Sequence, residues 1–83
     1  MTFDLTGSTR TVATAINPAG AITGFYDDAN GTIHGFLRDR AGTFTTFDPP
    51  GSVDTDPDAI NPAGVITGFY VANGTLHGFL RSP

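Results

Sequence analysis

The chain has 83 residues, no cysteine and a formal net charge of −4, which comes from eight aspartates and four arginines. Disulfides are therefore excluded, and the acidic balance disfavours nucleic acid, whose phosphates require a basic face. The sequence carries no signal peptide and no apolar run near the ~20 residues of a membrane span, so we expect no membrane partner.

Composition predicts an all-β protein. Lysine, glutamate, glutamine and tryptophan are absent, whereas threonine occurs 13 times and glycine 11 times. Most strong helix formers are thus missing, and β-branched residues favour strands. A chain this short buries only roughly 60% of its unfolded surface. Without disulfides, we expect the additional stability to come from a protein partner, and we expect no cofactor.

Four strands are expected in the first half of the chain, over residues 12–17, 21–26, 32–38 and 43–48, joined as a meander. Turn signals separate them. Asn17-Pro18-Ala19-Gly20 combines a proline with a glycine that accepts positive φ. Asn30-Gly31 is a strong hairpin signal, and Arg40-Ala41-Gly42 supplies the third turn.

The second half of the chain repeats the first at an offset of 44 residues. When residues 2–39 are aligned with 46–82 and Ala29 is omitted, 25 of the 37 positions are identical. Asn73-Gly74 in this alignment matches Asn30-Gly31. We therefore divide the chain into repeat 1, residues 1–43, which starts in the middle of a strand, and repeat 2, residues 44–83. A period of this length is typical of arrays, solenoids and propellers.

Neither face of the expected strands is clearly polar, so both faces should be covered. Small four-stranded antiparallel sheets packed around an axis meet this demand, and we predict two β-propeller blades per chain. Residues 1–4 match the second half of the strand at 43–48, so each copy lacks part of one strand. The amino-terminal segment of a neighbouring copy could complete it. Three chains would then close a six-bladed homotrimer, which we favour, and four would close an eight-bladed tetramer.

Recurring aromatic residues are the candidate ligand-binding positions: Phe25, Tyr26, Phe69 and Tyr70. Aromatic rings stack on sugars, so carbohydrate is the alternative partner, while core packing is the structural interpretation of the same residues. Six further residues are assigned structural roles: His34, His77, Asn30, Gly31, Asn73 and Gly74. Both Asn-Gly-Thr triplets match the glycosylation sequon, but a hairpin turn is the simpler interpretation.

Catalytic and metal sites are not expected. The two histidines occupy matching positions without a second histidine, cysteine or carboxylate pair at ligand spacing. Asp54, Asp56 and Asp58 resemble the start of a calcium loop, but the first repeat does not preserve them, so a solvated loop with Asx turns is preferred. No nucleophile elbow or repeated acid pair predicts an enzyme. An enzyme would require chemistry by the histidines at the ring centre.

The segments AINPAG, ITGFY, NGT, HGFLR and GTFTTFDPPGS resemble the HAF-type extracellular repeat of predicted secreted bacterial proteins. This chain has His-Gly-Phe where the family is named for His-Ala-Phe. The resemblance implies an extracellular parent protein with many repeats and no established activity, of which this chain is an excised or engineered fragment. We therefore expect a self-assembling structural repeat, with a carbohydrate-binding module carrying one site per blade as the alternative.

Overall fold

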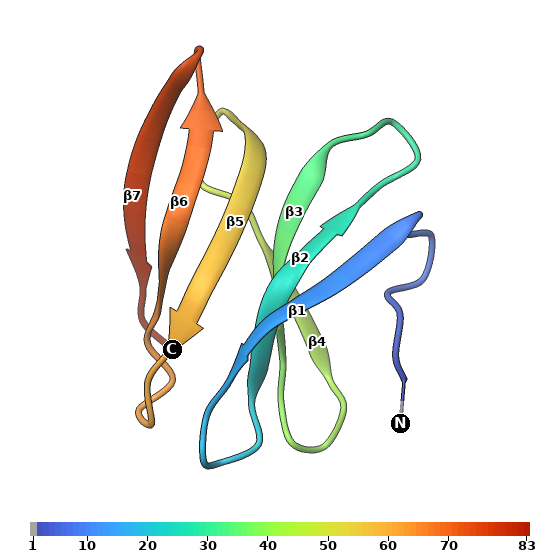
Figure 1. The fold of residues 1–83 in the computed structure, drawn as a ribbon, viewed down its shortest axis with the longest axis vertical. Helices are drawn as coiled ribbons and strands as arrows, with labels where there is room; N and C mark the ends of the chain where they lie inside the picture. Colours follow the sequence, from blue (N-terminus) through green and yellow to red (C-terminus); the bar gives the residue numbers. More distant parts are fainter. Residues whose placement is uncertain (1) are drawn as a thin grey trace.

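The computed structural model describes residues 2–83 as an all-β protein, an open sheet of seven strands (Figure 1). The all-β prediction is confirmed. The described residues include no helix, and hence none that could cross a membrane. The strands are β1 Arg10–Ile16, β2 Ile22–Asp27, β3 Ile33–Arg38, β4 Phe44–Phe47, β5 Ser52–Ile60, β6 Ile66–Ala72 and β7 Thr75–Arg81.

Strands β1 to β4 form an antiparallel meander, here called unit 1, and β5 to β7 form a second, three-stranded meander, unit 2. One parallel pairing, Ile33 with Asp54, joins the units into a single sheet. The strands therefore form one sheet, to which unit 1 contributes four strands and unit 2 three, in place of the two four-stranded sheets that we expected. In unit 2 the outer edge of β7 has no partner strand among residues 2–83. Residues 2–4 form no strand, and the predicted half-strand at Met1 lies outside the described residues.

The Asn-Pro-Ala-Gly turns close as their sequence predicts. Gly20 has φ +85°, its amide donates to the Asn17 carbonyl at 3.0 Å, and the Asn17 side chain accepts from the amide of Ala21 at 3.0 Å. Asn61 makes the matching contacts. An asparagine that bonds its own turn holds the backbone at the point where the chain reverses.

The two Asn-Gly pairs lie in turns of different length. Asn73 and Gly74 both have positive φ and form a two-residue hairpin between Ala72 and Thr75, as a type I′ turn requires. In unit 1 the extra residue gives a longer turn, in which the Gly31 amide donates to the Asp28 carbonyl and only the glycine has positive φ. The single-residue deletion thus changes the turn but keeps the strands on either side.

The aspartate run after Pro49-Pro50-Gly51 is a strand, so the prediction of a solvated loop there is wrong. Thr55 and Pro57 are fully buried on one face of β5, while the aspartates alternate onto the other. This period of two is the pattern of a half-buried strand. Pro57 is tolerated because the pairing shifts register between Pro57 and Ala59, and proline is accepted in strands at bulges.

The two units pack face to face. Pairing places Ile22, Gly24 and Phe36 on one side of unit 1, called face A, and Thr23, Gly35 and Phe47 on the other, called face B. Face B of unit 1 lies against face A of unit 2, which holds the matching residues Ile66, Gly68 and Phe79. Thr23 and Ile66 are both fully buried, and the Phe47 and Phe79 rings lie 5.9 Å apart. This contact forms one part of the core, and the buried Phe36 on face A of unit 1 forms another.

Two hydrogen bonds between β1, β5 and the turns that follow them add to this contact. The Thr14 hydroxyl donates to the carbonyl of Pro57 at 2.7 Å, and the Asn17 amide donates to the carbonyl of Asn61 at 3.1 Å. Asn17 and Asn61 are matching residues of the two units. The two units therefore touch at matching positions of their turns.

Candidate functional site

The amino-terminal segment lies on face A of unit 1. The Phe3 ring is 6.0 Å from the Phe36 ring and 5.6 Å from the Phe44 ring, and the guanidinium of Arg38 sits 5.2 Å from the Phe3 ring centre. Phe36 is fully buried as a result. An edge-on aromatic pair with a cation over one face is favourable packing.

The same contact occurs again between the units. Phe47, which matches Phe3, lies 5.9 Å from the Phe79 ring, and the Arg81 guanidinium is 5.0 Å from the Phe47 ring centre. Phe79 and Arg81 match Phe36 and Arg38. Residues 2–4 therefore lie against unit 1 as the end of β4 lies against unit 2.

The loops that follow these two segments also correspond. The Ser8 amide donates to the carbonyl of Leu5 at 3.1 Å, and the Ser52 amide donates to the carbonyl of Pro49 at 3.0 Å. In each loop the serine hydroxyl then hydrogen-bonds a threonine of the next strand, at 3.0 Å to Thr11 and at 3.3 Å to Thr55. The same turn geometry therefore follows residues 2–4 and the end of β4.

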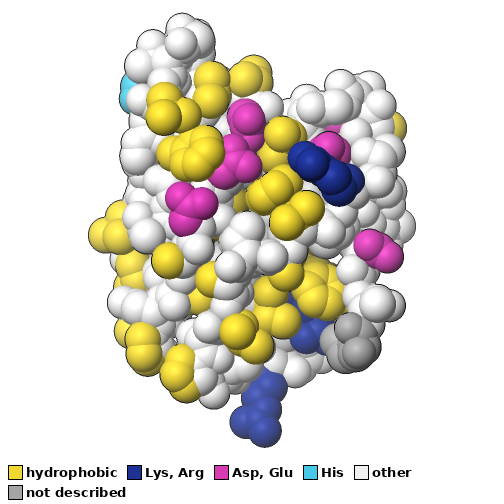
Figure 2. All heavy atoms as spheres, in the orientation of Figure 1, with side chains coloured by type: hydrophobic (Ala, Val, Ile, Leu, Met, Phe, Trp, Pro, Cys, Tyr) yellow, Lys and Arg dark blue, Asp and Glu magenta, His cyan; other side chains and the backbone are white. Residues whose placement is uncertain are grey.

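The outer edge of β7 is open. His77 to Arg81 repeats the sequence of His34 to Arg38, yet β3 pairs with β4 along this sequence, whereas β7 has no outer partner in the described chain. Leu76 and Leu80 on face B of unit 2 are 64% and 74% exposed. Figure 2 shows hydrophobic side chains distributed across one face of the molecule, with acidic groups gathered over β5. An unpaired edge with exposed leucines is a place where another strand can add.

A groove of about 570 Å³ runs beside this edge. Its lining residues come from the end of β4, from β6 and from β7: Phe47, Asp48, Pro49, Tyr70, Gly78, Phe79, Leu80, Arg81 and Ser82. In unit 1 the matching position is filled, because β4 pairs with β3 and Phe3 covers Phe36 and Phe44. The groove is therefore where a fourth strand of unit 2 would lie.

The four aromatic candidates do not form a common site. Tyr26 and Tyr70 stack on His34 and His77, each with ring centres 5.0 Å apart. Phe25 lies on the opposite face to Tyr26, under the Arg10 guanidinium at 5.2 Å. Of the four, Tyr70 borders the groove. Phe69, which matches Phe25, is half-buried on face B of unit 2.

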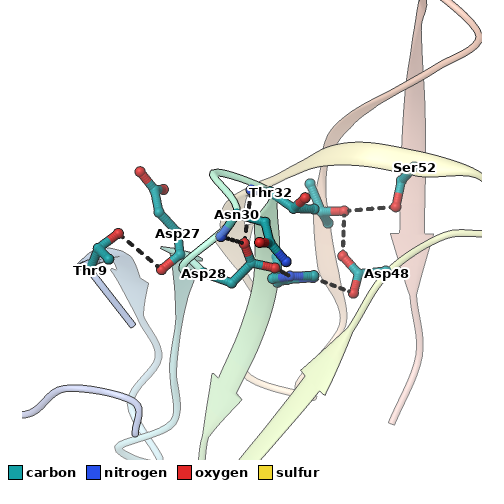
Figure 3. Close-up of polar contacts among 9 residues, drawn as sticks. Thr9, Asp27, Asp28, Asn30, Thr32, Asp48 and Ser52 are labelled. Carbon is teal, nitrogen blue, oxygen red and sulfur yellow. Dashed lines mark hydrogen bonds and ion pairs between the residues drawn. The ribbon is translucent and has the colours of Figure 1, made fainter. Parts of the chain in front are cut away.

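His34 is held between two carboxylates, Asp28 at 2.8 Å from Nε2 and Asp48 at 2.7 Å from Nδ1 (Figure 3). Burial lowers the pKa of His34, but hydrogen bonds to Asp28 and then to Asp48 outweigh burial and hold that pKa above its ordinary value. The same bond lowers the pKa of Asp28. Asp28 also accepts from two amides of its own turn, so this ion pair fastens the turn to the end of β4.

His77 has different surroundings. Its side chain is exposed, Ala72 stands where Asp28 stands in unit 1, and no carboxylate hydrogen-bonds it within residues 2–83. The position that matches Asp48 is Asp4, an exposed residue of the amino-terminal segment. The second histidine therefore lacks the partners that fix the first.

The aspartates of β5 form an acidic cluster without metal-site geometry. The described residues contain no group of three or more side chains placed to hold a metal ion. Burial, and the hydrogen bond that its acid form makes with Asp54, raise the pKa of Asp56 to about 7, with Asp58 adding to the effect and Arg10 opposing it. Asp56 therefore resists ionisation near neutral pH.

Two elements of the surface escaped sequence reasoning. The arginines that cover Phe3 and Phe47 could not be assigned from single residues, because Arg38 and Arg81 also fit exposed strand ends. Gly78 was likewise treated only as part of a strand. Both roles could have been predicted from two motifs taken together, because Thr-Phe-Asp and Gly-Phe-Leu-Arg each recur in the two halves of the chain.

No family model, curated protein or solved structure matches this chain. Function is therefore inferred from the contacts that the chain makes with itself. The strongest of these is the face-to-face contact of the units, which leaves face B of unit 2 open and part of face A of unit 1, at Ala13, exposed.

Proposed function

We propose that this protein is a self-assembling structural repeat whose copies associate head to tail into a closed β-propeller. The observation that carries the proposal is that the chain displays both halves of its own internal contact. Face B of unit 2 carries the counterparts of the β2 and β3 residues with which unit 1 packs on unit 2. Face A of unit 1 carries the counterparts of the unit 2 residues that receive them.

Exposure supports this assignment. Thr23 and Gly35 on face B of unit 1 are buried, while their counterparts Thr67 and Gly78 on unit 2 are exposed. Conversely, Pro57 on face A of unit 2 is fully buried, and its counterpart Ala13 on unit 1 is exposed. Repeating the internal contact between copies would bury both sets, and burial of apolar surface favours association.

A contact between unlike surfaces forms either a ring or an open filament, depending on whether the rotation closes. Propellers close with about four to eight blades. With two units per chain, three copies make six blades and four make eight. We favour the trimer, because six shallow blades accommodate the many glycines and alanines of these strands.

This proposal assigns the protein no catalytic step and no cofactor. His34 ties a turn to the end of a strand through two carboxylates, and His77 in unit 2 does not repeat these contacts. An extracellular parent protein, implied by resemblance to the HAF-type repeat, and an origin as a fragment of it belong to the same proposal.

The mass of the protein in solution tests the assembly. Native mass spectrometry and light scattering at micromolar concentration should return three times the 8.6 kDa of one chain. Four times that mass would support assembly but correct the blade number. A folded monomer that persists as the concentration rises would contradict the proposal.

Carbohydrate binding is the second candidate, favoured by one observation. The groove beside β7 combines the rings of Phe47, Tyr70 and Phe79 with the Asp48 carboxylate and the Arg81 guanidinium. Aromatic faces and a few polar groups are the usual lining of a ligand pocket. A glycan array followed by calorimetry separates the candidates. Saturable binding with one site per chain supports carbohydrate binding, and absence of binding leaves self-assembly as the proposed function.

A further inference from the structure

We infer that residues 2–4 of a second copy add to β7 as its fourth strand, with Phe3 of that copy opposite Gly78. This inference rests on the proposed assembly and specifies which atoms make the contact. The occupant of the groove is thus a segment of the same protein. Addition of a strand to an open edge supplies backbone hydrogen bonds for affinity and side-chain sites for specificity.

The register follows from unit 1. There β3 pairs with β4 so that Gly35 is opposite Phe47 and Phe36 is opposite Thr46. The residues that match this set are Gly78 and Phe79 on β7, and Phe3 and Thr2 in the amino-terminal segment. The added strand therefore places Phe3 opposite Gly78 and Thr2 opposite Phe79.

Gly78 is the slot for the incoming ring. A Cβ on Gly35 would lie 2.8 and 2.9 Å from two ring atoms of Phe47, so the glycine makes room for that phenylalanine. A Cβ on Gly78 would meet nothing nearer than the carbonyl oxygen of Gly68 at 3.9 Å. The space that Phe47 fills in unit 1 is therefore open in unit 2.

Polar groups complete the match. Asp48 accepts a hydrogen bond from His34, and the side chain of Thr46 lies beside that of Tyr26. In the added strand the matching pairs are Asp4 with His77 and Thr2 with Tyr70. The first is a charge-assisted hydrogen bond when the imidazole is protonated, the stronger kind.

Phe3 need not leave its own unit to make this contact. Phe47 performs both tasks at once, since its backbone pairs with β3 while its ring packs on Phe79 and Arg81 of the next unit. Phe3 already packs on Phe36 and Arg38 of its own chain. Its backbone edge then pairs with the preceding copy.

The decisive variant is Gly78→Val. In the chain itself the new side chain meets open space, so folding is retained, but in the assembly it occupies the place of the Phe3 ring. Thr75→Val is the matched control, because Thr75 is exposed on the same strand and lies outside the expected register. We expect Gly78→Val to raise the concentration of half-assembly about tenfold or more, as overpacking does, and Thr75→Val to leave it unchanged. Circular dichroism of the dilute proteins confirms that both variants fold.

A second measurement reads the register directly. In assemblies mixed from two isotopic labels, we expect a nuclear Overhauser effect between the Phe3 ring of one copy and the Gly78 α-protons of another. Assembly without this signal, and unaffected by Gly78→Val, would overturn the register while leaving the proposed assembly standing. A monomeric wild-type protein would overturn both. If the groove binds glycans and Phe3→Ala leaves the oligomer unchanged, the added strand is overturned.

Discussion

At the scale of single residues, the contacts of His34 hold the turn after β2 in place. Two carboxylates from different segments converge on one imidazole, and the remaining oxygen of Asp48 accepts from the Thr55 hydroxyl at 3.0 Å. The contact therefore spans the turn after β2, the end of β4 and the start of unit 2. His34, with Asp48 as the bridge to Thr55, thus links three parts of the chain.

His34→Gln should make the stability of the protein less dependent on pH. The raised pKa of His34 means that its contribution is fully present below the ordinary histidine value of about 6.5 and is lost as pH rises through the raised pKa. The lowered pKa of Asp28 means that the contribution is also lost as pH falls from the ordinary value of 3.8 through the lowered pKa of that carboxyl. We expect wild type to exceed the variant by about 1 kcal/mol between these limits.

Urea unfolding at pH 5.5 and at pH 9 measures this difference. The gap between wild type and His34→Gln should shrink at pH 9, and Asp28→Asn should remove part of the same dependence. Equal gaps at both pH values would show that the imidazole acts by packing alone.

At the scale of elements, the glycine of each Ile-Thr-Gly-Phe-Tyr strand allows the neighbouring strand to bulge. A Cβ on Gly24 would collide with the carbonyl oxygen of Val12, and one on Gly68 with that of Asp56. Both glycines are paired where the neighbouring strand shifts register, between Ala13 and Ala15 and between Pro57 and Ala59. Bulges bend a strand and increase its twist.

Gly24→Ala should therefore destabilise the fold by about 3 kcal/mol or more, because the obstacle is backbone and cannot rotate away. Thr75→Ala, at an exposed strand position, should change the stability by less than about 0.5 kcal/mol. Thermal unfolding of the two variants beside wild type measures both values. A Gly24→Ala protein as stable as wild type would show that the bulge can move.

The sequence was sufficient for the turns and for most strands, because Asn-Pro-Ala-Gly and Asn-Gly act through local backbone preference. It failed at β5. Three aspartates and a proline within five residues indicate a loop when taken by composition, while the alternation of Thr55 and Pro57 with them indicates a strand. The segment is a strand because Thr55 and Pro57 are buried against the rest of the protein, and the sequence of this segment alone does not reveal that burial. The candidate aromatic site failed similarly, since recurrence does not say on which face a ring lies.

At the scale of the whole molecule, the acidic cluster is where unit 2 departs from unit 1. Asp56 lies on face B of unit 2, opposite Phe69, where Val12 lies on face B of unit 1, opposite Phe25. If the internal contact is repeated between copies, this carboxyl is buried there. The raised pKa of Asp56, about 7, shows that its charged form is already disfavoured in a single chain.

Asp56→Val should accordingly strengthen association. In the folded single chain Asp56 is already protonated below its pKa of about 7. Further burial between copies raises that pKa again, so wild-type association should weaken as pH rises above about 7. The variant should assemble at about tenfold lower concentration at pH 8 and show little change with pH. Sedimentation at pH 5 and pH 8 tests this, and a variant that associates more weakly than wild type would contradict burial of this face.

The recurrence of the phenylalanine and arginine stack at the start of the chain and between the units gives the molecule a polarity. In the proposed assembly, each copy offers residues 2–4 as the donor at one end and the edge of β7 as the receiver at the other, and the two ends can be disabled separately. A copy blocked only at its receiver still occupies the receiver of a normal neighbour, so it acts as a terminator. In a ring of three, each such copy keeps at most two unmodified copies from closing, so the loss of rings should rise in proportion to the amount of blocked copy added.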